Sequence, residues 1–374
     1  MSIPDSAMLT KTEQAVYRLR SLFGSFGYTP YKMSKFEAYD LYLRNKSFLV
    51  SEHIITFTDH SGKLMALKPD VTLSIVKSAQ DDGVSVQKVY YNEHVYRVPK
   101  GDDRFKEIMQ MGIECVGHID GYNVSEVICL AAMSLAEFSP NYVLDISHLG
   151  ILSAFLDKLG ADHHTRNAIL GCVGEKNTHG IRELCNAEGL DHATVEALCR
   201  LVNLYGDSES ILPQLNALVT EQNCGQEAYA DLCDRIGDVK AVLPTARLQI
   251  DFSVVNSMSY YNGMVFRGFV PGVHTRVLSG GQYDLLVARM GKRGGAVGFA
   301  VYLDQLEALD KDLPDYDVDT LLVAENTPAA VLLGVVNARV AEGERVMAVK
   351  AVPENVTARQ TLYLDEKGEV TNAD

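Results

Sequence analysis

Two polar side chains are spaced so that they share one surface of a predicted β-strand. Polar and apolar residues alternate over residues 105–116, which is typical of a strand, and the alternation puts Gln110 and Glu114 on the same face. An amide and a carboxylate side by side can bind a small polar ligand, and a carboxylate can select an imidazole through a hydrogen bond to a ring nitrogen. The alternative is that both side chains line a sheet face exposed to solvent.

Charged and aromatic residues in other segments could bind further groups of the same small polar ligand. Asp70 stands at a predicted helix start, where its carboxylate and the hydroxyl of Thr72 can serve the first turn. A carboxylate in a dry site also suits a cationic amine, and the two interpretations of Asp70 are compatible. The planar guanidinium of Arg97 suits an oxyanion, and the adjacent Tyr260 and Tyr261 can flank an imidazole with rings and a hydroxyl.

Periodicity predicts the elements that must position these residues. Apolar residues repeat near the 3.6-residue period at 8–27 and 122–138, which predicts helices. From about residue 148 to 244 the same spacing dominates and predicts a helical insertion, whereas residues 312–318 have the composition of a linker. Runs of β-branched and aromatic residues between turn residues predict strands or hairpins. These runs are 54–67, 87–97, 105–116, 248–252, 260–266 and 296–301, and a strand, a helix and a strand follow the linker at 320–324, 328–342 and 345–349.

Composition restricts the class of protein. A chain of 374 residues exceeds the size of one hydrophobic core, so we expect two or more domains, and 47% hydrophobic with 22% charged residues is typical of a globular protein. No apolar run is long enough to cross a bilayer and the N-terminus lacks a secretory signal, so we expect a cytoplasmic protein with no membrane contact. Seven cysteines without a C-x-x-C pair favour free thiols, and we expect neither a metal nor another cofactor.

The charge argues against a nucleic-acid partner. The formal net charge is −15, and residues 315–374 carry eleven acidic side chains against five basic ones. A protein that binds tRNA must neutralise many phosphates with Lys and Arg. We therefore expect no tRNA binding, while the net charge alone leaves room for a local basic face.

Five motifs, in order along residues 8–310, resemble the catalytic core of class II aminoacyl-tRNA synthetases, and of histidyl-tRNA synthetase in particular. This resemblance implies an α+β fold, with an antiparallel sheet flanked by helices, a helical insertion at about 148–244 and a small C-terminal α/β fragment. It places the core at 1–311 and the C-terminal segment at 319–374. The motifs are residues 68–72, 95–105, 110–114, 259–266, and 279–284 together with 296–306.

The resemblance implies a pocket for histidine. In the family, the acidic residue at the Asp70 position holds the amino group, the Arg at the Arg97 position binds the substrate carboxylate, and the Gln and Glu at positions 110 and 114 contact the amino acid. Carried over residue by residue, the implied histidine-binding set is Asp70, Thr72, Arg97, Gln110, Glu114, Tyr260 and Tyr261.

The residues that would activate an amino acid depart from the family pattern. Asn256, Gln282 and Gln305 stand where the family has arginines, and Pro99 stands where it has the Glu that recognises adenine. Adenylyl transfer depends on positive groups around the phosphates, and removal of one preorganised partner costs roughly 10²–10³ in rate. We therefore expect no catalytic residue and no catalytic activity of the chain alone.

The sequence keeps the residues of the amino-acid pocket and lacks those of the activation chemistry. In this combination it resembles the family of ATP phosphoribosyltransferase regulatory subunits. This resemblance implies a homodimer that assembles with the short-form catalytic subunit of ATP phosphoribosyltransferase into a hetero-octamer. The complex would perform the first step of histidine biosynthesis under feedback by L-histidine. Two alternatives are a divergent histidine–tRNA ligase and a synthetase paralogue that modifies a protein or senses uncharged tRNA.

Overall fold

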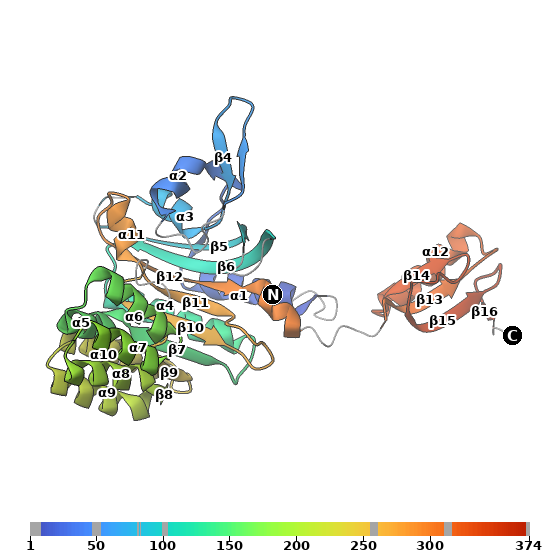
Figure 1. Cartoon of the computed structure of the whole chain (residues 1–374). Helices are drawn as coiled ribbons and strands as arrows, with labels where there is room; N and C mark the ends of the chain where they lie inside the picture. The colour runs from blue at the N-terminus through green and yellow to red at the C-terminus, as the bar shows by residue number, and fades with distance from the viewer. Residues whose placement is uncertain are drawn as a thin grey trace. The chain divides into compact units, whose positions relative to one another are not determined.

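The computed structural model describes residues 9–46, 54–80, 82, 84–98, 104–254, 261–309 and 316–371 (Figure 1). By internal contacts, the chain divides into two compact units, Met1–Leu309 and Asp310–Asp374. No helix in the described ranges combines the length and the apolar character that a membrane span requires.

A nine-stranded sheet forms the centre of the first unit (Figure 1). Its strand order is β1-β5-β6-β12-β11-β10-β7-β9-β8. Neighbouring strands are antiparallel except for the pairs β1–β5 and β7–β9, which are parallel. The strands are β1 (Thr29–Pro30), β5 (Val86–Arg97), β6 (Lys106–Gly117), β7 (Val143–His148), β8 (Tyr205–Asp207), β9 (Leu248–Asp251), β10 (Met264–Phe269), β11 (Leu278–Gln282) and β12 (Gly295–Tyr302).

Different helices cover the two faces of this sheet. Met111 and Ile113 of β6 belong to a buried cluster with residues of α1 (Lys11–Ser25) and α4 (Gly121–Ala136). Val116 of the same strand belongs to a second cluster with α3 (Thr72–Ser78) and α11 (Asp284–Arg289). Because side chains alternate along a strand, the even-numbered residues of β6, which include Gln110 and Glu114, lie on the face toward α3 and α11. A 3-10 helix, η3 (Leu303–Leu309), follows β12.

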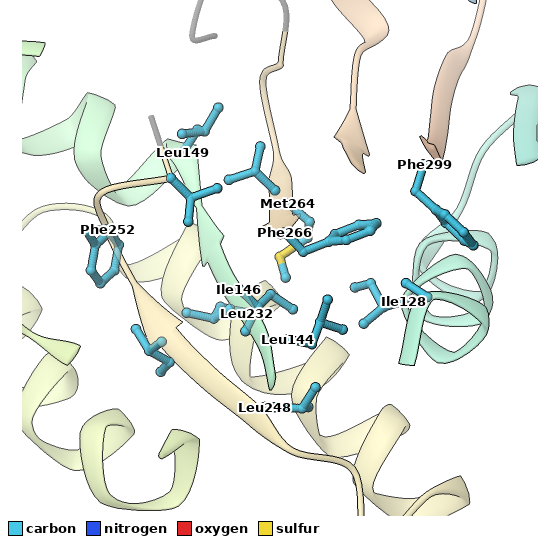
Figure 2. Close-up of a cluster of buried hydrophobic side chains, with 14 of the residues drawn as sticks. Ile128, Leu144, Ile146, Leu149, Leu232, Leu248, Phe252, Met264, Phe266 and Phe299 are labelled. Atoms are coloured by element: carbon cyan, nitrogen blue, oxygen red, sulfur yellow. The ribbon is translucent and has the colours of Figure 1, made fainter. Parts of the chain in front are cut away.

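The helical insertion packs against the end of the sheet that β7, β9 and β8 form. It contains α5 (Leu149–Leu159), α6 (His163–Gly174), α7 (Thr178–Ala187), α8 (His192–Asn203), α9 (Ser208–Gln222) and α10 (Gln226–Val242), with β8 between α8 and α9. Its apolar side chains continue the core of α1 and α4 without interruption, because one buried cluster extends from the sheet into these helices. Figure 2 shows the junction, at which the side chains come from α4, α5, α10 and the strands β7, β9, β10 and β12.

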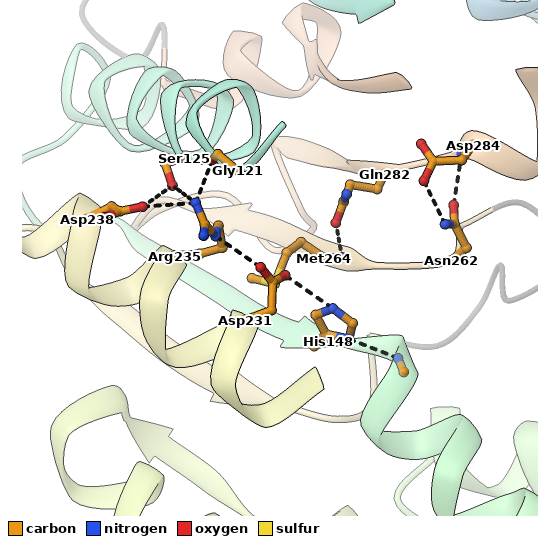
Figure 3. Close-up of polar contacts among 11 residues, drawn as sticks. Gly121, Ser125, His148, Asp231, Arg235, Asp238, Asn262, Met264, Gln282 and Asp284 are labelled. Carbon is orange, nitrogen blue, oxygen red and sulfur yellow. Dashed lines mark hydrogen bonds and ion pairs between the residues drawn. The ribbon is translucent and has the colours of Figure 1, made fainter. Parts of the chain in front are cut away.

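A polar network also joins α10 to the sheet (Figure 3). Arg235 of α10 donates to the Gly121 carbonyl at 2.6 Å and to Ser125 Oγ at 2.8 Å, both at the start of α4. Arg235 Nε also contacts Asp231, whose Oδ2 lies 3.3 Å from His148 Nε2 at the end of β7. His148 Nδ1 accepts from the Gly150 N–H at 3.0 Å, so the imidazole fixes the turn from β7 into α5.

The predicted hairpin at 54–67 is present as part of a small separate sheet. β3 (Thr56–Thr58) and β4 (Leu64–Leu67) are antiparallel, and β2 (Phe36–Ala38) pairs with the other edge of β4. Asp59 closes the turn, because its Oδ1 accepts from the backbone N–H groups of Ser61 and Lys63 at 2.8 and 2.9 Å. The short helix α2 (Tyr39–Arg44) follows β2.

The prediction of a hairpin at 260–266 is wrong. The strand β10 begins at Met264 and pairs with β7 on one side and with β11, the next strand along the chain, on the other, so residues 264–266 form part of one strand and not a hairpin. Residues 255–260, including Asn256, Ser259 and Tyr260, lie outside the described ranges. Sheet register is decided by tertiary packing, which a local run of β-branched and aromatic residues does not reveal.

The second unit contains the predicted strand–helix–strand and two further strands. β13 (Val318–Val323) pairs in parallel with β14 (Val346–Val349) and with β15 (Ala358–Leu364), and β16 (Val370–Thr371) extends the sheet beside β15. The helix α12 (Ala329–Ala341) packs Leu332, Val335 and Val336 against Leu322 of β13. The strands β15 and β16 were not predicted from the sequence.

Glycine at position 298 of β12 makes room for the buried side chain of Glu114, and we expect substitution there to destabilise the fold. A Cβ at 298 would overlap the Glu114 carboxylate and the Ile113 carbonyl oxygen. The Gly298→Ala variant should lose roughly 1–3 kcal/mol of unfolding free energy, as for other overpacked sites. Urea unfolding measures this change.

A helical glycine in open space serves as the matched control. Nothing lies within 4 Å of a Cβ built on Gly237 of α10. Gly237→Ala should raise the unfolding free energy by roughly 0.5–1 kcal/mol, since alanine restricts the unfolded chain and favours the helix. Equal midpoints for wild type and Gly298→Ala would contradict the close approach at this position.

Candidate functional site

The side chain of Glu114 is buried in the sheet and held by two hydroxyl groups. Only 3% of the residue is exposed, so the alternative of a solvated sheet face is wrong. Thr72 Oγ1, at the start of α3, donates to Glu114 Oε1 at 2.7 Å. The Tyr283 hydroxyl, just before α11, donates to Glu114 Oε2. The carboxylate therefore ties two helices to the central strand β6, and its position is fixed before any ligand arrives.

Burial dominates the electrostatics of Glu114. Loss of water raises the pKa of its carboxyl to about 8, while the hydrogen bonds from Tyr283 and Thr72 oppose this shift and the charge of Asp70 adds to it. A carboxyl that titrates near neutral pH can either accept a proton from a neighbouring group or donate one. The pH range in which the Glu114 carboxyl titrates overlaps that of an imidazole, whose unperturbed pKa is about 6.5.

Asp70 caps α3 and also faces Arg97. Its Oδ1 accepts from the Leu73 N–H at 2.9 Å, as expected of a residue at a helix start. Its Oδ2 lies 3.7 Å from Arg97 Nη2, and Arg97 Nε donates to the Pro69 carbonyl at 2.6 Å. Burial raises the pKa of Asp70 and the charge of Arg97 lowers it. The interpretation of Asp70 as a helix cap and its interpretation as a binding group for an amine are therefore compatible, because each carboxylate oxygen has a different partner.

Gln110 is as buried as Glu114 and lies on the same face of β6. It is 3% exposed and is paired in register with Tyr302 of β12 and Glu93 of β5. Glu93 in turn binds the ammonium of Lys68, a fully buried lysine, with Nζ 2.5 Å from Oε2. This ion pair connects β5 to the segment that leads into Asp70, so it helps to position both halves of the predicted site.

The tyrosines of the site differ from the predicted pair. Tyr261 is half-buried and packs against both hydrophobic clusters, and burial, followed by the charges of nearby groups that include Glu114 and Asp70, raises its pKa. Tyr260 lies outside the described residues. Two further tyrosines, which no sequence motif assigned to the pocket, also lie near the carboxylates.

These two are Tyr283 and Tyr91. Tyr283 donates to Glu114, and Tyr91 is 2% exposed with a pKa raised by burial and by the charges of Glu114 and Asp70. Gly112 lies beside Tyr91, because a Cβ there would be 2.6 Å from the Tyr91 hydroxyl. The position of Tyr283 inside the motif 279–284 was a signal for its role, whereas nothing in the local sequence around Tyr91 indicated one.

The neutral residues at family arginine positions have structural partners. Gln282 Oε1 accepts from the Met264 N–H at 2.8 Å and so fixes the start of β10 (Figure 3). Gln305 Oε1 accepts from Thr275 Oγ1 at 2.6 Å, and its Nε2 donates to Asp304 at 3.0 Å. Both amides are used to hold neighbouring segments, and neither brings a positive charge to the site.

Asn262 and Asp284 brace the same region of the sheet. The Asn262 amide donates to Asp284 Oδ2 at 2.9 Å, and its Oδ1 accepts from the Asp284 N–H at 2.8 Å (Figure 3). Asp284 Oδ1 accepts from the Ala296 N–H at 2.8 Å. These bonds join the entry of β10, the start of α11 and β12, and thereby hold Tyr283 against Glu114.

Comparison with known proteins places the chain in a family. The family model of histidyl-tRNA synthetase matches residues 5–306. This chain belongs to the histidyl-tRNA synthetase family. An ATP phosphoribosyltransferase regulatory subunit from Clostridium kluyveri is 27% identical over 76% of this chain and 74% of its own. The predicted resemblance to such regulatory subunits is confirmed.

Solved structures confirm the predicted α+β fold of the class II synthetase type. An ATP phosphoribosyltransferase regulatory subunit/histidyl-tRNA synthetase from Bacillus halodurans superposes with a TM-score of 0.77 at 21% identity, covering 97% of this chain and 99% of that one. A chain of the ATP phosphoribosyl transferase complex from Thermotoga maritima gives 0.61 at 19% identity, covering 78% and 97%. At these identities the likeness concerns the fold.

We predict that Glu114 makes the stability of this histidyl-tRNA synthetase family member depend on pH. Its carboxyl keeps its proton up to about pH 8 when folded, against an ordinary value of 4.5. Since the folded state binds the proton more tightly, the stabilisation is complete below pH 4.5 and is lost as pH rises toward 8, with a slope of up to about 1.4 kcal/mol per unit.

Urea unfolding at pH 5, 6.5 and 8 measures this slope. The Glu114→Gln variant should show a flatter pH dependence than wild type. Glu227→Gln, an exposed position on α10, should keep the wild-type dependence. Parallel curves for wild type and Glu114→Gln would contradict the raised pKa.

Proposed function

We propose that this chain is a regulatory subunit of ATP phosphoribosyltransferase that binds L-histidine and has no catalytic activity alone. In this proposal a separate catalytic subunit joins ATP to phosphoribosyl pyrophosphate in the first step of histidine biosynthesis. The observation that carries the proposal is the contrast between a buried, preorganised Glu114 and the neutral Gln282 and Gln305 at positions where synthetases use arginine. The name of the Clostridium kluyveri relative supports it.

The chemistry of the pocket matches each polar part of histidine. Glu114 can exchange a hydrogen bond with an imidazole nitrogen, because its raised pKa allows either protonation state near neutral pH. The buried carboxylate of Asp70 suits the ammonium group, and the guanidinium of Arg97 suits the carboxylate. The proposed histidine-binding residues are Asp70, Thr72, Arg97, Gln110, Glu114, Tyr260 and Tyr261.

The proposal extends to assembly and organisation. The chain would form a cytoplasmic homodimer that builds a hetero-octamer with the short-form catalytic subunit. Residues 1–311 would act as the synthetase-like core and residues 319–374 as a separate domain. The solved ATP phosphoribosyl transferase complex from Thermotoga maritima, whose chain shares this fold, supports a catalytic partner of this kind.

A divergent histidine–tRNA ligase is the second candidate, because the family model that matches is that of the synthetase itself. The charge pattern favours the regulatory function. Stabilising the phosphates of ATP in a transition state needs preorganised cations, and the two described amides at family arginine positions are occupied with Met264, Thr275 and Asp304.

We expect L-histidine to bind the purified chain, and the Glu114→Gln variant to bind it at least about tenfold more weakly, since glutamine cannot exchange a proton with the imidazole and a hydrogen bond to a charged group contributes roughly 1.5–3 kcal/mol. Isothermal titration calorimetry measures the affinity. The exposed substitution Glu227→Gln is the matched control and should leave it unchanged. Equal affinity for wild type and Glu114→Gln would refute the pocket assignment.

In the complex with the catalytic subunit, Glu114→Gln should preserve phosphoribosyl transfer and weaken inhibition by histidine, because the change affects the effector pocket and leaves the partner's chemistry intact. Pyrophosphate release at increasing histidine concentration measures both properties. Histidine-dependent exchange of pyrophosphate into ATP by the isolated chain would instead establish the ligase.

A further inference from the structure

Lys68 is a lysine that the fold removes completely from water. It is 0% exposed, and among the lysines of the described ranges no other is buried. Its ammonium lies 2.5 Å from Oε2 of Glu93 on β5, and Glu93 Oε1 accepts from the Met33 N–H at 3.4 Å. Glu93 belongs to none of the motifs found in the sequence. Because the side chain of Lys68 is buried, it can act on a ligand only through its neighbours.

An ion pair in such a place is a poor source of stability. Two charges taken out of water lose hydration that their mutual attraction barely recovers, and uncharged side chains of similar volume often stabilise a protein as well or better. A single charge left behind in the same place is strongly destabilising, because it has neither water nor a partner. The pair therefore needs an explanation other than stability, and its position in the fold supplies one.

The pair stands where the segment that carries Asp70 crosses β5. The Lys68 carbonyl accepts from the Tyr96 N–H at 3.0 Å, and the Pro69 carbonyl accepts from Arg97 Nε at 2.6 Å. Asp70 Oδ2 then lies 3.7 Å from Arg97 Nη2. The Lys68 side chain thus joins this segment to the strand that carries Arg97. A shift of Lys68 would change the distance between the Asp70 carboxylate and the Arg97 guanidinium.

We propose that Lys68 and Glu93 are positioning residues that make the pocket selective for the charged end of an α-amino acid. They hold the Asp70 carboxylate and the Arg97 guanidinium at one spacing, and an amino acid presents its ammonium and carboxylate at a fixed spacing on one carbon. Binding groups must keep their geometry to within about 0.5 Å, which a short charged contact achieves better than apolar side chains that can slide. The imidazole is assigned to Glu114, so the pair leaves its binding unaffected. This inference rests on the proposed function and names the part of histidine that the pair serves.

Removal of both charges together tests this role. In Lys68→Met/Glu93→Gln neither charge remains, and the amide oxygen at position 93 can still accept from the Met33 N–H. We expect its urea midpoint to lie near that of wild type and above those of the two single variants, each of which leaves one charge unpaired. In calorimetry, L-histidine should bind the double variant at least about tenfold more weakly than wild type, an effect typical of residues that support metal ligands. Stability is then recovered while affinity is not.

Two comparisons separate positioning from a general structural role. The probe 4-methylimidazole lacks the ammonium and the carboxylate, so its affinity in an NMR titration should be the same for the double variant and wild type. The matched control is Lys77→Met/Glu37→Gln, which removes a more exposed ion pair of 2.9 Å. This control should change neither the urea midpoint nor the affinity for histidine, because exposed pairs contribute little.

Three outcomes would overturn the inference. They are wild-type affinity of the double variant for L-histidine, an equal loss of affinity for both ligands, and a double variant no more stable than the single ones. In each case the pair would serve either nothing in the pocket or the fold alone. Absence of histidine binding by the wild-type chain would instead contradict the proposed function, on which the inference rests.

Discussion

The buried carboxyl of Glu114 is the interaction on which the site depends. Its two oxygens accept from Thr72 and Tyr283, so one side chain of β6 connects the start of α3 to the start of α11. The backbone of Gly298 leaves the space that this side chain fills. A carboxyl held by two hydroxyls in a dry environment keeps a fixed geometry, and its burial makes its protonation sensitive to whatever occupies the pocket.

Around that carboxyl, charge is distributed unevenly over one face of the sheet. Asp70 and Arg97 form a second charged pair beside it, and the amides of Gln282 and Gln305 are engaged in holding strands and loops. On the same face, Arg267 and Arg276 line one cavity together with Gln305.

The amides at the family arginine positions have structural partners of their own. Gln282 binds the backbone at the start of β10, and Asn262 with Asp284 binds the neighbouring strand and helix. These contacts hold Tyr283 in place. Gln282, Asn262 and Asp284 therefore stabilise the scaffold around Glu114.

The strand face of the site residues and the start of α3 could be predicted from the sequence, because both depend on local patterns. The alternation in β6 put Gln110 and Glu114 on one face, and the motif containing Asp70 marked the start of α3. The failures have a common physical cause. The pairing of β10 with β7 and the approach of Tyr91 to Glu114 join residues that are far apart along the chain.

The sequence by itself therefore determined the types of chemical group, their order and the face of each strand, since these follow from side-chain identity and backbone period. Only the tertiary structure decided which groups are dry, which hydroxyls reach Glu114, and where cations gather. Burial and electrostatics are properties of the packed molecule, because both depend on distances between segments that local sequence does not encode.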